Sequence, residues 1–211
     1  MFKHVLHLRK YVWDITSLSI TLLILSTITV LNIITPEITF QTTTDVLLKI
    51  FAPLILTIVF HELVHVAIAV KLGYKVKVGY GRIRFNPVLY VKVVSGIRKK
   101  HYIAIILSPL IILSLAAIGL ALVIPNSLIK QALSVLFIMN TAGSSGDILL
   151  ALSVMRISED ALVEDYGTMI VANKPIPSPY SERVSLIVKL LAILAVLTLI
   201  VLFKVKVIVV K

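Results

Sequence analysis

Four side chains able to do chemistry lie inside long apolar stretches of this chain of 211 residues. Three of them belong to one string, His61-Glu-Leu-Val-His65, and the fourth is Asp147. Of the ten acidic residues, only Glu62 and Asp147 fall inside such stretches, and of the five histidines only His61 and His65 do. An ionisable group surrounded by hydrocarbon is energetically costly, so it is a candidate functional residue by default.

The spacing of the two histidines is that of metal ligands on a helix. Residues four apart share one helical face, roughly 6 Å apart, so both imidazoles can reach one zinc ion at about 2.0–2.1 Å. Glu62 is offset by roughly 100° around the helix, which suits a general base that reaches metal-activated water better than it suits a further ligand. The alternative is a chance His-x-x-x-His pair on a core helix, whose polar groups would all need partners in hydrocarbon.

Asp147 is the candidate third ligand, because a catalytic site with two histidines needs one more protein ligand and an open position. His61 lies ten residues before Lys71 and Asp147 lies nine before Arg156, each near the end of an apolar stretch. At 1.5 Å per residue both lie about 14 to 15 Å from the same boundary. We therefore expect one zinc ion held by His61, His65 and Asp147. A neutral carboxylic acid bonded to a neighbouring serine or asparagine is the alternative for Asp147.

Asn140 precedes Asp147 by seven residues, two helical turns, and so lies on nearly the same face. Its amide could donate a hydrogen bond to a developing oxyanion, which makes Asn140 a candidate catalytic residue beside Glu62. It could equally be an interhelical hydrogen-bonding residue, as asparagine often is in membranes. The small residues between them, 142–146, permit close helix approach or a locally unwound stretch that lines a cavity.

The composition places these residues in a membrane protein. The chain is 59% hydrophobic with a mean hydropathy of +1.05, and only 15% of its residues are charged, against about 25% in a soluble domain. These values exclude a soluble globular protein, and disorder requires the opposite balance. Cysteine is absent, so there is no disulfide and no thiolate ligand. The net charge of +11 is attributed to loops on the cytoplasmic side, not to nucleic-acid binding.

We predict an all-α polytopic membrane protein of about five transmembrane helices, with a small β-hairpin or sheet addition on the cytoplasmic side. A span needs roughly 20 apolar residues, and five segments qualify within a single membrane domain, 1–211: Ile15–Ile34, Val46–Leu72, Tyr102–Ile124, Leu128–Ile157 and Val184–Phe203. With the N-terminus inside, 16 of the 21 Lys and Arg residues lie on the cytoplasmic side. This asymmetry predicts a cytoplasmic N-terminus and, after an odd number of spans, a C-terminus outside.

Two connections carry a strand signal. Residues 73–96 are rich in Val, Tyr, Ile and Phe with glycine breaks, which predicts a cytoplasmic or re-entrant hairpin turning at Gly79–Gly81 or at Asn86-Pro87. Residues 161–172 resemble them, with a turn near 165–167, and the proline-rich 174–179 cannot be helix. The first hairpin could hold an extended substrate at its edge, or lie with its basic residues against anionic lipid.

The motif in one span and an aspartate two spans later resemble the intramembrane zinc metalloproteases of the site-2 type. More narrowly, the chain resembles small membrane proteins grouped as putative zincin peptidases, whose His-Glu-x-x-His helix is followed by a Ser-x-Gly-Asp-like segment, here Ser144-Ser-Gly-Asp147. The resemblance covers about 46–157, a three-span catalytic core. It implies that His61, His65 and Asp147 bind zinc and that Glu62 is the base. Unlike the Asn-x-x-Pro-x-x-x-Leu-Asp-Gly pattern of the site-2 class, this chain lacks the proline and ends the segment Gly-Asp-Ile.

The function expected from these residues is that of an intramembrane zinc metallopeptidase, which hydrolyses a peptide bond of a membrane-anchored protein or peptide with zinc-activated water. One alternative is a metal transporter or non-catalytic metal-binding membrane protein, which would need polar residues across the bilayer. Outside the motif the two spans offer few, Thr57 and Ser134. A second alternative is a pseudoprotease that binds membrane partners, although Glu62 is intact. The expected partners are the substrate and the lipid bilayer; no nucleic acid is expected.

Overall fold

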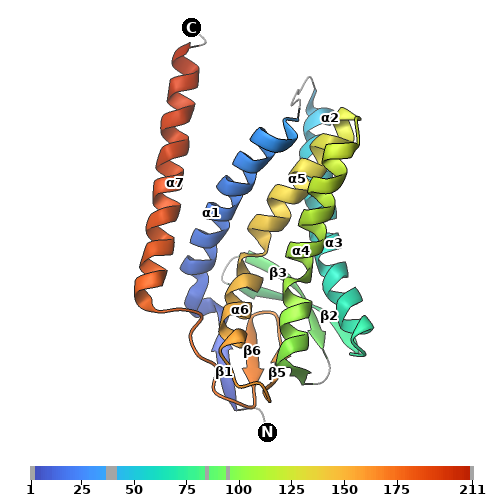
Figure 1. Cartoon of the computed structure of the whole chain (residues 1–211), viewed down its shortest axis with the longest axis vertical. Helices are drawn as coiled ribbons and strands as arrows, with labels where there is room; N and C mark the ends of the chain where they lie inside the picture. The colour runs from blue at the N-terminus through green and yellow to red at the C-terminus, as the bar shows by residue number, and fades with distance from the viewer. Residues whose placement is uncertain (1–2, 37–41, 84–85, 94–95, 210–211) are drawn as a thin grey trace.

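The computed structural model describes residues 3–36, 42–83, 86–93 and 96–209, and most of them are helical. Figure 1 shows long helices running side by side, with the strands gathered toward the end where the N-terminus lies and the C-terminal end of α7 at the opposite end. The helices are α1 (Val12–Thr29), α2 (Thr43–Val46), α3 (Ala52–Lys71), α4 (Lys99–Val123), α5 (Ser127–Gly143), α6 (Ser145–Met155) and α7 (Glu182–Val209). A 3-10 turn, Leu8–Tyr11, precedes α1; π-helical turns follow it at Val30–Ile34 and join α2 to α3 at Leu47–Phe51.

Four segments of the described chain are long and apolar enough to cross a membrane: Leu8–Ile34, Thr43–Lys71, Lys99–Val123 and Glu182–Ile200. They correspond to the first, second, third and fifth predicted spans. The fourth predicted span, Leu128–Ile157, is interrupted at the small residues where the sequence allowed an unwound stretch. The chain there forms the bent pair of α5 and α6, which meet at an angle of 42° and count as a fifth crossing only if the pair is one span.

The break between α5 and α6 lies within the run of small residues. The backbone leaves the helical region at Ser144, where ψ is 3°. The Oγ atom of Ser144 donates a hydrogen bond of 2.8 Å to the carbonyl oxygen of Asn140, a back-bonded serine geometry that often bends helices. Flanking glycines further weaken helical continuity. The break matters because α6 begins just after it, two residues before Asp147.

Two antiparallel sheets accompany the helices. One has four strands in the order β1-β6-β5-β4, and the other is the hairpin of β2 and β3. Their bounds are β1 (His4–His7), β2 (Val76–Ile83), β3 (Asn86–Val93), β4 (Ile97–Arg98), β5 (Leu162–Asp165) and β6 (Met169–Ala172). The sequence did not reveal β1 and β4, which are four and two residues long and gain their partners only in the folded chain.

Both predicted hairpins are present. The β5–β6 turn falls near Asp165 as expected, and Gly167 supplies the positive φ of 72° that it requires. For the first hairpin, the predicted turn at Gly79–Gly81 is wrong. Strand β2 continues through these residues to Ile83, which pairs with Asn86. The connection between those two residues, 84–85, lies outside the described residues, and Asn86-Pro87 begins β3. Residues 174–179 are non-helical as predicted.

The main core joins the helices to the four-stranded sheet. Tyr102 of α4, Leu149 and Val154 of α6, and Val163 and Ile170 of the sheet are each at most 2% exposed. The outer helix faces are different, because they carry exposed large apolar side chains along α1, α3, α4 and α7, such as Leu115, Val123 and Leu194. The core therefore fixes α4 and α6 against the sheet, and with them the position of Asp147.

Candidate metal centre

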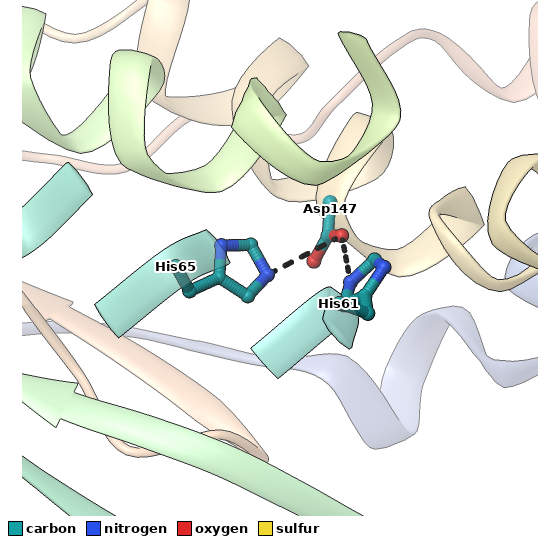
Figure 2. A group of neighbouring side chains, drawn as sticks. All are labelled: His61, His65 and Asp147. Atoms are coloured by element: carbon teal, nitrogen blue, oxygen red, sulfur yellow. Dashed lines mark hydrogen bonds and ion pairs between the residues drawn. The ribbon is translucent and has the colours of Figure 1, made fainter. Parts of the chain in front are cut away.

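The three predicted ligands converge at one point between α3 and α6. The Nε2 atom of His61 lies 3.0 Å from the Oδ2 atom of Asp147, and the Nε2 atom of His65 lies 3.7 Å from the same oxygen. Figure 2 shows both imidazoles projecting from α3 toward the carboxylate on the neighbouring helix. One ligand atom from each residue can be chosen so that all three lie within 4.8 Å of one another.

This donor set fits a zinc ion. In a tetrahedral site with ligands about 2.0–2.1 Å from the metal, neighbouring ligand atoms are roughly 3.3 Å apart. The separations of 3.0 and 3.7 Å lie on either side of that value. Two imidazole nitrogens and one carboxylate oxygen are among the donor sets that zinc uses in catalytic sites, with the fourth position left for water or substrate. The side chains are 14%, 10% and 18% exposed, so the site is shielded but reachable.

A carbonyl oxygen of α4 orients His65. The Nδ1 atom of His65 lies 2.9 Å from the carbonyl oxygen of Ile105. That oxygen can only accept, so Nδ1 carries the proton and Nε2 offers its lone pair toward Asp147. The oxygen is available because Pro109, four residues along α4, has no N–H to donate to it. A proline inside a helix thus leaves available the carbonyl acceptor that fixes the tautomer of a candidate metal ligand.

An amide from α5 orients His61 in the same way. The Nδ1 atom of His61 lies 3.0 Å from the Oδ1 atom of Asn140, whose side chain is buried at 1% exposure. The Nδ2 atom of Asn140 donates to the carbonyl oxygen of Pro109 and to the Oγ atom of Ser114, each at 3.0 Å. The Pro109 carbonyl only accepts, so Nδ2 must face it and Oδ1 must face His61. Both imidazoles therefore present Nε2 as a lone-pair donor.

Glu62 lies beside the three ligand residues and is partly buried. It follows His61 on α3, so its side chain leaves the helix on a different face from the two histidines. It is within electrostatic range of His61, Asp147 and Asp165. A carboxylate in this position is next to the ligand set without belonging to it, as a general base must be.

Comparison with known proteins agrees with the geometry. A family model described as "Putative zincin peptidase" matches residues 54–162, a span that runs from α3 to the start of β5 and includes every residue of the centre. The chain belongs to this family. It is also similar to a protein from Pyrococcus woesei described as "Uncharacterized 24.7 kDa protein in gap 5'region", with 31% identity over 201 residues, 93% of this chain and 86% of that protein. No solved structure matches the chain.

The segment that the family model matches ends just before a further acidic residue near the centre. Asp165, at the end of β5, accepts a hydrogen bond of 2.6 Å from the Tyr102 hydroxyl and one of 2.7 Å from the backbone N–H of Gly167. Burial raises the pKa of Asp165 to about 6, and the two hydrogen bonds oppose that shift. The sheet therefore contributes a carboxyl group within range of Glu62 and Asp147.

The structure thus brings together all five residues singled out from the sequence. His61, His65 and Asp147 form the cluster, Glu62 adjoins it, and Asn140 contacts His61. The amide N–H groups of Asn140 are engaged by α4, which is the interhelical contact considered above; its oxyanion role stays a prediction. Pro109, Ser114 and Asp165 were not found from the sequence. The signal available for Pro109 was a proline inside an otherwise continuous apolar span.

Proposed function

We propose that this chain is a zinc metallopeptidase of the His-Glu-x-x-His type that acts within the membrane on a membrane-anchored protein or peptide. The observation that carries the proposal is the convergence of His61, His65 and Asp147 on one point with Glu62 beside them. Membership of a family described as a zincin peptidase supports the same reaction class. The arrangement of the motif also resembles that of the site-2-type proteases.

Each residue has a defined task in peptide hydrolysis. The Nε2 atoms of His61 and His65 and the Oδ2 atom of Asp147 would hold the ion, and Asn140 and the Ile105 carbonyl keep both imidazoles in the binding tautomer. When bound, zinc would supply Lewis acidity and lower the pKa of water. The Glu62 carboxylate accepts the proton of the attacking water and returns it to the leaving amine. That step requires the base to be separate from the ligands, as Glu62 is.

The exposed apolar faces of the helices support action within a bilayer. Large hydrophobic side chains such as Leu115 at 68% and Leu194 at 60% exposure would be costly in water but favourable against lipid. We propose the N-terminus on the cytoplasmic side and the C-terminus outside, from the Lys and Arg asymmetry. The site then lies about 14 to 15 Å from the cytoplasmic boundary, the side from which water would enter. The hairpin of β2 and β3 offers an edge for an extended substrate.

The test is zinc-dependent cleavage in a defined system. The full chain is reconstituted into vesicles with a panel of fluorogenic single-span peptides, and cleavage is followed with zinc, after chelation by phenanthroline, and after zinc is restored. We expect cleavage that chelation abolishes and zinc recovers. Zinc accumulation inside the vesicles without cleavage would replace the proposal with metal transport. Tight zinc binding with neither cleavage nor transport would replace it with a non-catalytic metal-binding role.

A further inference from the structure

Helices α1 and α7 line an open apolar groove that shares no lining residue with the metal centre. In Figure 1, α7 stands at the edge of the molecule beside α1. The groove has a volume of about 550 Å³ and is lined by apolar side chains of both helices, with Lys189 and two hydroxyl residues of α1 at its polar positions. From Lys189 to Leu197 its length along α7 is about 12 Å at 1.5 Å per residue. One bilayer leaflet contributes about 15 Å of hydrocarbon, so the groove extends over most of one leaflet.

A polar cavity of about 610 Å³ adjoins this groove, and Lys189 lines both. Asp14 is its fixed acidic group, since the Asp14 side chain is only 7% exposed. Its carboxylate accepts hydrogen bonds from Tyr180 at 3.1 Å and Ser185 at 2.5 Å, and pairs with Lys189 at 3.3 Å. These bonds hold the base of the cavity in place and join α1 to α7.

Lys10 is the second cation that lines the cavity. Its ammonium group lies 5.8 Å from the centre of the Tyr11 ring, and it forms no ion pair within the residues that the structure describes. The remaining carboxylate, Glu182, is exposed. The cavity therefore presents two ammonium groups at its wall, hydroxyl groups, and a carboxylate that can accept from donors.

Aromatic residues place this cavity at the depth of lipid headgroups. Tyr11 and Tyr180 line the cavity, and Trp13, which is 63% exposed, lines the adjoining end of the groove. Tryptophan and tyrosine gather at the boundary between hydrocarbon and headgroups. The groove below this level then lies in hydrocarbon, and the cavity lies among phosphates.

We propose that the groove and the cavity together bind one phospholipid. Its phosphate lies between Lys10 and Lys189, the exposed Glu182 accepts from headgroup hydroxyl or ammonium groups, and one acyl chain lies in the groove between α1 and α7. A helix is a poorer occupant, because it would cover the apolar groove but bring no anionic group to Lys10 in the adjoining cavity. This site is independent of the proposed peptidase activity.

The experiment uses the delipidated full-length protein in maltoside detergent and palmitoyl-oleoyl phosphatidylglycerol as the probe, with bound lipid counted by native mass spectrometry. Two matched pairs of variants distinguish a specific lipid-binding site from unspecific contact with lipid. Lys10→Gln is compared with Arg9→Gln, whose exposed arginine does not line the cavity. Ile193→Trp, which fills the groove, is compared with Ile187→Trp; these isoleucines are 56% and 54% exposed, and only Ile193 lines the groove.

We expect the wild-type chain to bind one lipid. Lys10→Gln should bind it about fivefold more weakly, and Ile193→Trp should lose at least as much affinity. Both control variants should bind the lipid as the wild type does. Equal loss in a variant and its control, or no loss in either, would overturn the proposal in favour of unspecific lipid contact. Competition by glycerol phosphate as strong as by the lipid would overturn the role of the groove. Displacement of the lipid by a single-span peptide whose binding Ile193→Trp abolishes would make the groove a helix site. Val196→Trp serves the same purpose if Ile193→Trp does not fold.

Discussion

The Nδ1 atom of His61 on α3 lies 3.0 Å from the Oδ1 atom of Asn140 on α5. This contact links α3, which carries both histidines, to α5, which precedes the helix of Asp147. It also places the proton of His61 on Nδ1, the nitrogen that faces away from Asp147. Partners of this kind orient metal-binding histidines, and their loss typically costs roughly 10- to 100-fold in affinity. Asn140 is in turn fixed by two bonds to α4. Contacts among three helices, α3, α4 and α5, therefore fix the orientation of the His61 imidazole.

Substitution of Asn140 separates its two suggested roles. Asn140→Ala removes the acceptor, so zinc affinity should fall roughly 10- to 100-fold. Asn140→Asp keeps an acceptor for His61 and removes the amide donors, so it should retain zinc more fully. Affinity is measured by competition with a chromogenic chelator, and cleavage is measured beside it. If Asn140→Asp retains zinc and loses cleavage, the amide acts as an oxyanion donor; if Asn140→Ala binds zinc normally, the positioning role is wrong.

Pro109 should matter through the Ile105 carbonyl oxygen. Pro109→Ala restores a backbone N–H that competes for this oxygen, which already accepts from the Ser108 hydroxyl and from His65. We expect zinc affinity to fall by up to about tenfold, because an outer partner is weakened without being removed. Pro53→Ala is the control, since Pro53 also lies within a long helical segment, Thr43–Lys71, and its carbonyl oxygen accepts from Thr57 and not from a ligand residue. An equal effect in both variants would show only general loss of stability.

Stability should depend on pH through Asp165. Its ordinary pKa of 3.8 rises to about 6 in the folded chain because of burial. The folded state therefore binds this proton more tightly than the unfolded state, so the contribution of Asp165 to stability falls as pH rises from about 4 to about 6. Thermal unfolding of zinc-free protein in detergent should show a smaller fall in this range for Asp165→Asn than for the wild-type chain. An unchanged pH dependence would mean that Asp165 does not titrate in this way.

Topology follows from the distribution of basic residues. Reporter fusions at Lys92 and at Lys211 should place the first in the cytoplasm and the second outside, because 16 of 21 Lys and Arg residues lie on one side of the predicted membrane. A fusion at Lys71 provides an internal control, since it should agree with Lys92. A C-terminal reporter accessible from the cytoplasm would mean that the bent pair of α5 and α6 enters and leaves on the same side.

The ligand set could be predicted because few residues in apolar segments can do chemistry. His61 and Asp147 are 86 positions apart in the chain, yet their similar distances from basic span ends, ten and nine residues, placed them at nearly one depth. The long helices followed from hydropathy alone. The break at Ser144 could only be suggested, because small residues permit both a continuous helix and a bend, and the bond from the Ser144 hydroxyl to Asn140 decides between them.

Other features depend on contacts that no local pattern records. The strand β1 forms because His4–His7 pairs with β6, more than 160 residues later. The partner of His65 is a backbone oxygen, and its availability depends on Pro109 lying on the face of α4 that meets α3. Asp165 lies within electrostatic range of the centre because the sheet packs against α4 through Tyr102. Such arrangements follow from tertiary packing, so the sequence alone could not predict them.

The most direct test of the central claim compares the wild-type chain with Glu62→Gln and His65→Ala for zinc content and peptide cleavage in the same vesicles. His101→Ala is the control for His65→Ala, because His101 lies outside the ligand cluster. We predict about one zinc per chain in the wild type, in Glu62→Gln and in His101→Ala, and loss of zinc in His65→Ala. Glu62→Gln should cleave at least about 10²-fold more slowly, because the base is absent while the ligands are intact. Full cleavage by zinc-loaded Glu62→Gln would contradict the account.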